Sequence, residues 1–145
     1  MTDHRIQKAE AIIAKNCSHT APEGTMPYCV LALLDAEGYP TASTLTAAKA
    51  DGLREITFCT GLGSNKAKRI QGSSHASVCF SADDYNITLA GDIEIVTDPA
   101  VKQNNWYSGL ENHFTGSDDP GYCVLRFRTR RYGLFIDWEE SEGSL

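Results

Sequence analysis

The sequence predicts a mainly β protein, a small antiparallel barrel of six to seven strands flanked by short helices. Short segments in which apolar and polar residues alternate recur along the chain, and turns rich in Gly, Pro and Asp separate them. Most connections between these segments are too short for a helical crossover, which favours antiparallel pairing. The length of 145 residues suits a single domain, residues 1–145, with its own core.

Composition limits the possible partners and the compartment. The chain has 41% hydrophobic and 22% charged residues, which is ordinary for a soluble globular protein. No apolar run approaches the roughly 20 residues of a membrane span, and the polar amino terminus is unlike a signal peptide. A net charge of −6 argues against a nucleic-acid partner. Five isolated cysteines indicate a reducing compartment, so we expect a cytoplasmic protein.

The first third of the chain predicts one helix and a hairpin. Residues 2–15 carry an apolar stripe at helical spacing, and residues 28–34 form a strand that is apolar on both faces and is therefore expected to be central in the sheet. Between them lie Cys17 and His19, two possible metal ligands that are too few to make a metal site. A turn then leads to a second strand, residues 41–48, of small and β-branched side chains.

The middle of the chain predicts three further strands around a second helix. A turn at residues 49–52 precedes the first of these strands, and the helix occupies residues 64–72. Gly91 lies inside the last strand, where a glycine often marks a bend or a close backbone approach. The three strands are expected at residues 54–60, 76–82 and 86–97.

The last third predicts a helix followed by strands. Residues 98–110 begin with Asp-Pro, which suits an N-cap followed by the first helical position. A strand at 122–130 follows, and 132–138 is either a seventh strand or its continuation. The acidic tail, residues 139–145, is expected to be frayed.

The corner where the third strand meets the second helix carries the clearest functional signal. Gly61 and Gly63 are expected to give its turn positive φ angles, and Ser64 is suited to cap the helix. Lys66 and Lys68 fall in the first helical turn, where the helix dipole disfavours cations. A phosphate held by free N–H groups, a hydroxyl and an ammonium would explain them. Solvated lysines at an ordinary corner are the alternative.

Two familiar phosphate loops do not fit this corner. A Walker loop needs Gly-Lys followed by Ser or Thr, whereas Lys66 follows Asn65. A Rossmann fingerprint needs a third glycine where Lys66 stands, with an acidic residue further along in a βαβ unit. The sequence therefore indicates neither a P-loop nor a Rossmann site.

The segment Phe58–Ala67, FCTGLGSNKA, resembles the flavin-phosphate loop of the pyridoxamine 5′-phosphate oxidase-like family, the FMN-binding split barrels. The shared pattern is an aromatic-rich strand end, a Thr, a short Gly loop, and Ser-x-Lys at the start of a helix. The likeness extends in order over nearly all of the chain, and it is greatest to the short members known as general stress proteins. It implies a split barrel that binds FMN and acts as an oxidoreductase on an unknown small substrate.

The resemblance also implies roles for individual residues. Ser64 and Lys66 would hold the flavin phosphate, because a hydroxyl and an ammonium both donate to it. The third strand would lie along the isoalloxazine ring, and the second strand would meet its reactive edge mainly through backbone groups. Asn86 would meet the polar edge of the ring, although a turn residue is the plain alternative. The implied cofactor-binding residues are Ser43, Thr44, Leu45, Cys59, Thr60, Ser64, Lys66, Asn86 and Trp138.

The chain departs from the family pattern at its cations. Ser43 and Asn65 stand where the family often has basic residues, which implies weaker phosphate binding. Arg126, Arg128 and Arg130 alternate along one strand, so they indicate a solvated face more simply than a clamp for pyridoxal phosphate.

Proteins of this type are homodimers with the flavin in a cleft between subunits, so the resemblance implies a homodimer. Trp106 and Trp138 are both candidates for that cleft or for the interface. Core packing is the alternative for each, and it is favoured for Trp106. No side chain is an obvious catalytic acid or base, so a non-enzymatic flavin-binding stress protein remains an alternative. A haem-binding relative is another, and its axial ligand would be His4, His19, His75 or His113.

Overall fold

The computed structural model of the chain describes residues 3–145. Its helices are α1 (His4–Lys15), α2 (Asn65–Gly72), α3 (Pro99–Asn105) and a short 3₁₀ helix, η1 (Leu110–Asn112). Its strands are β1 (Cys29–Leu34), β2 (Pro40–Leu45), β3 (Ala47–Asp51), β4 (Glu55–Gly61), β5 (His75–Ala82), β6 (Tyr85–Val96), β7 (Tyr122–Ile136) and β8 (Glu139–Ser144).

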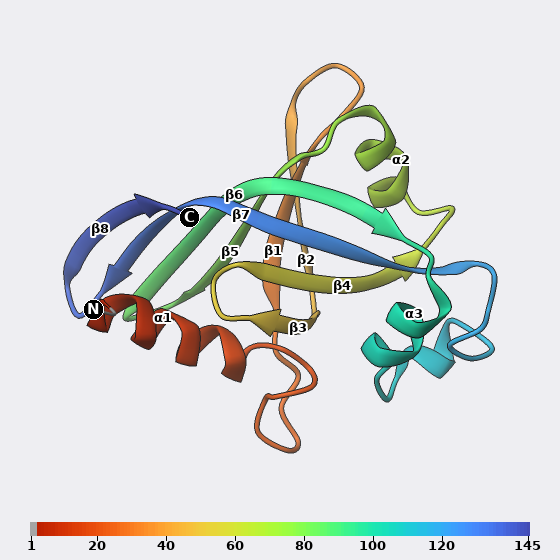
Figure 1. Cartoon of the computed structure of the whole chain (residues 1–145), viewed down its shortest axis with the longest axis horizontal. Coiled ribbons are helices and arrows are strands. Elements are labelled where there is room, and N and C mark those ends of the chain that lie inside the picture. The colour runs from red at the N-terminus through yellow and green to blue at the C-terminus, as the bar shows by residue number, and fades with distance from the viewer. Residues whose placement is uncertain (1–2) are drawn as a thin grey trace.

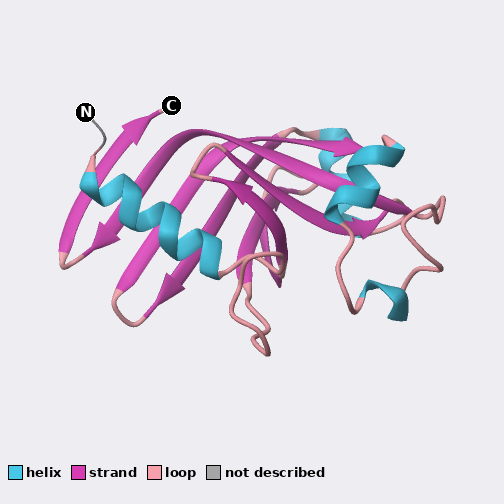
Figure 2. Ribbon diagram, turned by 60° about the horizontal axis from the view of Figure 1, so that its bottom comes forward, coloured by secondary structure: helices cyan, strands magenta, loops and turns pink. Residues whose placement is uncertain are grey.

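The strands form a single curled antiparallel sheet (Figure 1). Its order is β2-β1-β5-β6-β7-β4-β3, and β8 adds to β7. β2 and β3 stand at the two ends of this order, yet only Thr46 separates them in the chain. The sheet therefore has to bend back on itself, which gives the open barrel seen in Figure 2. The predicted mainly β, antiparallel split barrel is confirmed.

The core fills the inner face of this curled sheet. Register places Leu31, Val78 and Leu89 side by side on neighbouring strands, and all three are fully buried. α1 buries Ala9 and Ile13 against the same core, as its apolar stripe predicts. No helix among residues 3–145 has the length and apolar character needed to cross a membrane.

Gly91 marks a close backbone approach, as expected. The pairing of β6 with β7 shifts register between Ala90 and Gly91. A Cβ added to Gly91 would lie 1.9 Å from the carbonyl oxygen of Arg128, closer than any side chain can approach. This bulge lets the long β6–β7 pair bend around the core.

Several predicted boundaries are wrong. The turn expected at residues 49–52 lies later in the chain, because β3 continues to Asp51 and β4 begins only at Glu55. Residues 41–48 do not form one strand, because the chain breaks between β2 and β3 at Thr46, whose hydroxyl donates to the carbonyl of Pro27 at 2.9 Å. α3 ends at Asn105 rather than near residue 110. The first helix has Asp3 as its N-cap, and Thr2 lies outside the described residues. The strand at 122–130 continues without interruption, as one of the two alternatives stated.

The expectation of a frayed tail is also wrong. β8 pairs with β7 over its whole length, from Glu139 opposite Ile136 to Ser144 opposite Arg131. β7 extends beyond its pairing with β4 and so offers a free edge to the returning chain. An ion pair of 2.6 Å between Arg5 and Glu139 also joins this hairpin to α1.

Candidate functional site

The corner between β4 and α2 is the candidate phosphate site. β4 ends at Gly61, and Ser64 caps α2 with extended backbone angles of φ −70° and ψ 159°. The Oγ of Ser64 accepts a hydrogen bond from the N–H of Ala67 at 3.2 Å, and its N–H donates to the carbonyl of Gly61 at 3.1 Å. The predicted strand, turn and capped helix are therefore confirmed.

Two hydroxyls meet at this corner. Thr60 Oγ1 donates to Ser64 Oγ at 3.3 Å, and both residues are half-buried. The N–H groups of Gly63, Asn65 and Lys66 have no acceptor within residues 3–145. Because the first N–H groups of a helix lack internal partners and carry the positive end of its dipole, the corner offers several donors to an anion.

α2 adds positive charge beside these donors. It carries Lys66, Lys68 and Arg69 and no acidic residue. Lys66 is half-buried, and none of the three cations makes an ion pair within the described chain. In a protein of net charge −6, this local excess favours an anion at the corner.

The expectation of positive φ angles at Gly61 and Gly63 is wrong. A Cβ on Gly63 would meet nothing within 4 Å, and one on Gly61 would make ordinary contacts with Gly121 and Phe114. The turn therefore uses backbone angles open to other residues. The glycines with positive φ are Gly24, Gly38, Gly52 and Gly109.

Cys59 faces away from the hydroxyl pair. Its Sγ lies 3.4 Å from the carbonyl of Asn105 and 3.4 Å from Tyr122 Oη. Cys59 and Thr60 are neighbours on a strand and so point to opposite faces, and only Thr60 joins Ser64. Burial raises the pKa of the Cys59 thiol to about 11, so the thiol is neutral at physiological pH.

Ser43, Thr44 and Leu45 lie at the end of the edge strand β2. Their backbone pairs only with β1 on one side, which leaves the other edge of β2 free. β2 leads directly into β3, where Ala47 pairs with Phe58 of β4. The chain thus carries this end of β2 toward the end of the barrel that holds the candidate phosphate site.

Asn86 and Trp138 lie at the other end of the sheet. Thr60 pairs with Cys123 on β7, whereas Asn86 pairs with Phe135, which is twelve residues further along the same strand (135 − 123). Trp138 follows β7 with 79% of its surface exposed. One copy of the chain therefore does not bring these two residues to the corner between β4 and α2.

Asn86 is a strand residue rather than a turn residue. It lies within β6, where its side-chain amide donates to Thr88 Oγ1 at 3.1 Å. Its Oδ1 accepts from the thiol of Cys79 at 3.4 Å. The amide is exposed on the outer face of the sheet, which is the face opposite the core.

A segment that sequence reasoning did not connect to the corner packs against it. The N–H of Leu62 donates to the carbonyl of Gly121 at 2.9 Å. Lys102, which is only 7% exposed, donates from Nζ to the carbonyl of Asp119 at 2.9 Å and lies 5.4 Å from the ring centre of Tyr122. Asp-Pro-Gly at 119–121 signals a turn in the sequence, but nothing there identifies its neighbours.

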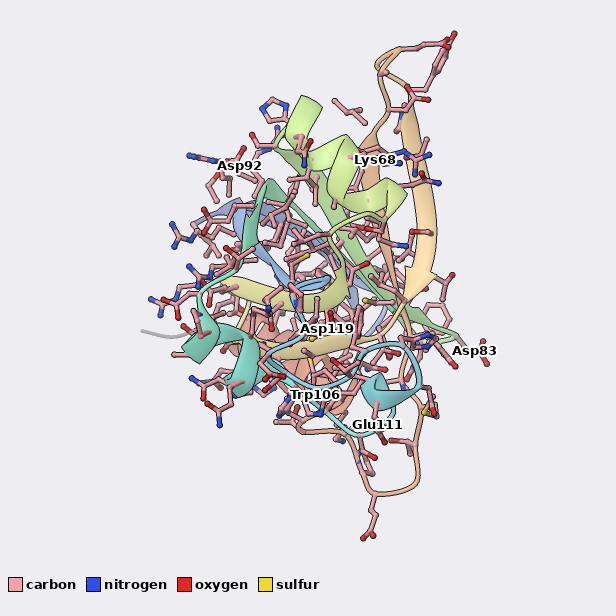
Figure 3. All side chains as sticks on the ribbon, turned by 90° about the vertical axis from the view of Figure 1, so that its right-hand side faces the viewer. Lys68, Asp83, Asp92, Trp106, Glu111 and Asp119 are labelled. Carbon is pink, nitrogen blue, oxygen red and sulfur yellow. The ribbon has the colours of Figure 1, made fainter. Side chains whose placement is uncertain are left out.

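Aromatic side chains fill the space beside that segment. The ring centre of Trp106 lies 5.3 Å from that of Tyr122 and 6.5 Å from that of Phe114, both in edge contacts. Trp106 packs against these two rings, but it is half-buried and is not a member of the hydrophobic core, so the predicted core-packing role is met only in part. Figure 3 shows Trp106 and Asp119 on the same side of the molecule.

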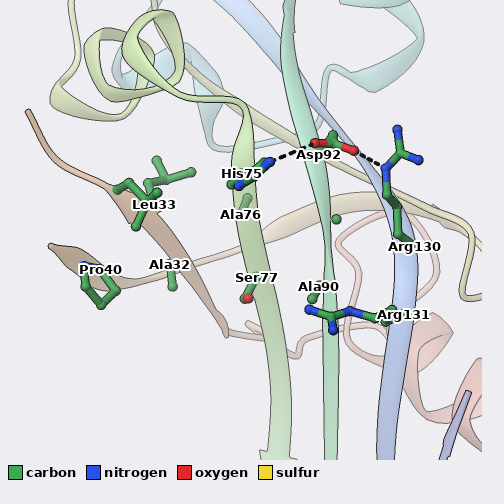
Figure 4. Close-up of a pocket in the computed structure, with 12 residues that line it drawn as sticks. Ala32, Leu33, Pro40, His75, Ala76, Ser77, Ala90, Asp92, Arg130 and Arg131 are labelled. Atoms are coloured by element: carbon green, nitrogen blue, oxygen red, sulfur yellow. Dashed lines mark hydrogen bonds and ion pairs between the residues drawn. The ribbon is translucent and has the colours of Figure 1, made fainter. Parts of the chain in front are cut away.

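A separate cleft lies on the outer face of β1, β5, β6 and β7 (Figure 4). It has a volume of about 570 Å³ and includes no residue of the corner. Asp92 pairs with Arg130 at its rim and lies 4.0 Å from His75 Nε2, and Arg130 lowers the pKa of that carboxyl. Small side chains of Ala32, Ser77 and Ala90 form much of its floor.

The two possible metal ligands of the first loop have other partners. Cys17 is buried and its thiol donates to the carbonyl of Ile13 at 3.3 Å, while His19 Nε2 lies 3.1 Å from the carbonyl of Asn105. Within residues 3–145, no group of three or more His, Cys, Asp or Glu side chains is placed to hold a metal ion.

Three solved structures resemble the chain over almost its whole length. A protein from Clostridium acetobutylicum related to general stress protein 26 is 20% identical, with 100% of this chain and 97% of that one covered and a TM-score of 0.81. A pyridoxamine 5′-phosphate oxidase-related, FMN-binding protein from Nostoc punctiforme is 18% identical, with coverages of 98% and 93% and a TM-score of 0.57. A heme-binding protein from Mycobacterium smegmatis is 17% identical, with coverages of 99% and 59% and a TM-score of 0.73.

These structures establish the fold, and the family is shown by sequence. No curated protein matches the chain. The family model described as pyridoxamine 5′-phosphate oxidase matches residues 24–135, which is more than half of the chain and spans β1 to β7 almost completely. The chain belongs to the pyridoxamine 5′-phosphate oxidase family.

Proposed function

We propose that the protein binds FMN with its phosphate at the corner between β4 and α2, and that it acts as an oxidoreductase on a small substrate. The observation that carries this proposal is the pair of hydroxyls on Thr60 and Ser64, 3.3 Å apart beside free N–H groups and the half-buried Lys66. The Ser64 hydroxyl, the free N–H groups and the Lys66 ammonium are donors that suit a phosphate dianion, and Thr60 positions the Ser64 hydroxyl. The FMN-binding relative from Nostoc punctiforme supports the choice of flavin.

Lys66 carries much of the charge in this proposal. Ser43 and Asn65 are neutral where a family member often has cations, so fewer positive groups share the phosphate. A hydrogen bond to a charged group contributes roughly 1.5–3 kcal/mol. Loss of Lys66 should therefore weaken FMN binding by roughly tenfold to a hundredfold.

We also propose that two copies complete the site. Asn86 and the exposed Trp138 lie too far along β7 to reach the phosphate corner of their own chain, but they could reach that of a second copy. On the outer face, Ala32 pairs with Ser77, and Ser77 with Ala90. A row of small side chains lets a second sheet approach closely, which supports packing through this face.

The bound flavin would supply the redox chemistry. The chain would bind its phosphate through Ser64 and Lys66 and orient the ring along β4 and the free edge of β2. Cys59 would take part only through its backbone, because its neutral thiol faces α3. Ser43, Thr44 and Leu45 have free backbone groups on the open side of β2 for the ring edge.

The direct test is an FMN titration followed by flavin fluorescence and by thermal unfolding. Stoichiometric binding should raise the unfolding free energy by about 2.7 kcal/mol at a free FMN concentration of 100 Kd. Lys66→Ala should lose most of this gain. Lys15→Ala is the matched control, because Lys15 is an exposed lysine on α1 and lies outside the corner.

If excess FMN does not change the melting temperature, the protein does not bind FMN and the proposal is wrong. A melting temperature raised equally in Lys66→Ala and wild type would move the flavin to another site. Sedimentation with and without FMN tests the two-copy site, and Asn86→Ala should weaken FMN binding only in the assembled form.

Two further assays separate the remaining functions. Stopped-flow mixing of the FMN-loaded protein with NADH or NADPH should reduce the flavin. Binding without reduction by any donor would instead indicate a flavin-binding stress protein. Because a heme-binding protein shares the fold, a haemin titration is the matching assay, and a Soret band lost in His75→Ala or His113→Ala would favour that function.

A further inference from the structure

A polar groove adjoins the proposed phosphate site on the far side of α2. It lies between this helix and the turn that joins β1 to β2. Figure 1 shows α2 beside the tip of this hairpin, and Figure 3 shows Lys68 on α2 next to it. The groove is lined by Asn65, Lys68, Arg69 and Gly72 on one side and by Asp35 and Ala36 on the other.

The helical spacing of these residues gives the groove one continuous wall. Asn65, Lys68, Arg69 and Gly72 are three, four and seven residues apart, which places them on one side of a helix. The opposite side of α2 buries Ala67 and Ile70. The helix therefore cannot rotate about its axis to bury its polar side. The polar side of α2 is therefore fixed toward the hairpin.

The cations of the groove are not neutralised by the protein. Arg5, Arg54, Arg126, Arg128 and Arg130 all make ion pairs with carboxylates. Lys68 and Arg69 make none within residues 3–145.

Asp35 is the one acidic residue of the groove lining, and its carboxylate stabilises the β1–β2 turn in which it lies. Its Oδ1 accepts from the N–H of Glu37 at 3.0 Å and from the N–H of Tyr39 at 2.9 Å. The groove lining therefore carries two positive charges and one negative charge, which leaves a net charge of +1 for a ligand (2 − 1).

The groove lies next to the phosphate corner, because Asn65 lines the groove and directly follows Ser64 in the chain. Lys68 lies four residues after Ser64, which corresponds to about 6 Å along the helix axis. Its N–H donates to the carbonyl of Ser64 at 3.1 Å, so the two residues belong to the same helical turn. At the far end, a Cβ on Gly72 would meet nothing within 4 Å, which leaves the groove open for a bulky group.

We propose that this groove binds a second phosphoryl group, next to the one at Ser64. The inference rests on the proposed FMN site. The second group belongs either to a flavin dinucleotide that occupies the corner or to a dinucleotide co-substrate of the flavin. A phosphoryl group fits because Arg69 can bind two of its oxygens and Lys68 adds a point charge.

The first experiment compares FMN with FAD by fluorescence titration at low and physiological salt. The proteins are the wild type, Lys68→Gln, Asp35→Asn and the control Lys15→Gln. FAD should bind more tightly than FMN to the wild type. Lys68→Gln should weaken FAD binding threefold to fivefold and FMN binding by a smaller factor, because Lys68 contributes only general positive charge to the corner. Asp35→Asn keeps the acceptor of the turn but removes the negative charge, so it should tighten FAD binding.

The second experiment tests the co-substrate. Calorimetric titration of the FMN-loaded protein with NADP⁺ should show binding that Lys68→Gln weakens and Lys15→Gln leaves unchanged. Inorganic pyrophosphate should compete with NADP⁺ for the groove.

The outcomes distinguish this inference from the function on which it rests. If FMN binds but FAD binds no more tightly, and Lys68→Gln matches Lys15→Gln with both FAD and NADP⁺, the groove has no second phosphoryl site. The FMN proposal would survive that result. If neither flavin binds, both proposals fall together.

Discussion

Lys102 Nζ donates a 2.9 Å hydrogen bond to the backbone carbonyl of Asp119, 17 residues further along the chain. Tyr122 Oη donates back to the carbonyl of Lys102 at 2.8 Å, and the carboxylate of Asp119 accepts from the N–H of Gly121 at 2.8 Å. These bonds fix the carbonyl of Gly121, to which Leu62 donates at the start of the phosphate corner. A buried lysine thus supports the corner from outside it.

Lys102→Met should therefore destabilise the protein and loosen the corner. The substitution removes one of two donors from the half-buried carbonyl of Asp119, which keeps its hydrogen bond from the N–H of Tyr122 at 3.0 Å, so we expect a loss of about 1 kcal/mol of unfolding free energy. Urea denaturation measures this loss, and amide hydrogen exchange should be faster at Leu62 than in the wild type. Lys15→Met serves as the control at an exposed lysine. Unchanged exchange at Leu62 would contradict the supporting role of Lys102.

Gly91→Ala should be far more harmful than Gly133→Ala. A Cβ at Gly91 would lie 1.9 Å from the carbonyl oxygen of Arg128, and this backbone cannot move without breaking the β6–β7 bulge. We expect a loss of about 3 kcal/mol. At Gly133, where a Cβ would meet nothing within 4 Å, we expect a loss below about 1 kcal/mol. Equal melting temperatures for the two variants would show that the bulge is not rigid.

Ser64→Ala and Ser64→Gly should separate capping from phosphate binding. Both remove the hydroxyl that accepts from Ala67. Alanine at an N-cap costs about 1 kcal/mol of stability, whereas glycine costs only a few tenths. FMN affinity should fall to a similar extent in both variants, because both lose the hydroxyl donor. If FMN affinity instead follows stability across the pair, the hydroxyl acts only as a cap.

Stability should decline at alkaline pH because of the buried thiols. Burial raises the pKa of Cys17 to about 12 and that of Cys59 to about 11, whereas an unfolded thiol ionises near about 8.5. Between these values the folded state holds more protons than the unfolded state, so stability falls as pH rises. The contribution is complete below about pH 8.5 and disappears as pH passes the folded values. The melting temperature should fall from pH 8 to pH 10, and by less in Cys59→Ala; equal slopes would exclude Cys59 as a contributor.

Local chemistry made much of the fold and the corner predictable. Alternating burial on β5 follows the alternation of Val78 and Phe80 with smaller polar residues. Ser64 could be recognised as a cap because a capping hydroxyl acts on the backbone only a few residues away. The strand, turn and helix of the candidate site can therefore be predicted from the segment Phe58–Ala67 alone.

Long-range contacts were not predictable in this way. Nothing near Lys102 indicates that its ammonium meets Asp119, and nothing near Leu62 indicates Gly121. β8 was missed because its acidic sequence lacks apolar alternation. The free edge of β7 determines its structure, and the sequence of the tail does not reveal that edge. The resemblance named Asn86 as a site residue, but only the strand register shows how far it lies from Thr60.

The length of β7 has a consequence for any symmetric pair of these molecules. One end of this strand is hydrogen-bonded to the strand that carries Thr60, and the other end to the strand that carries Asn86. If two copies share two flavins, each β7 strand would connect the phosphate corner of one flavin site to the Asn86 side of the other site. Occupancy of the first would then be transmitted to the second, and the two binding events should be cooperative rather than independent.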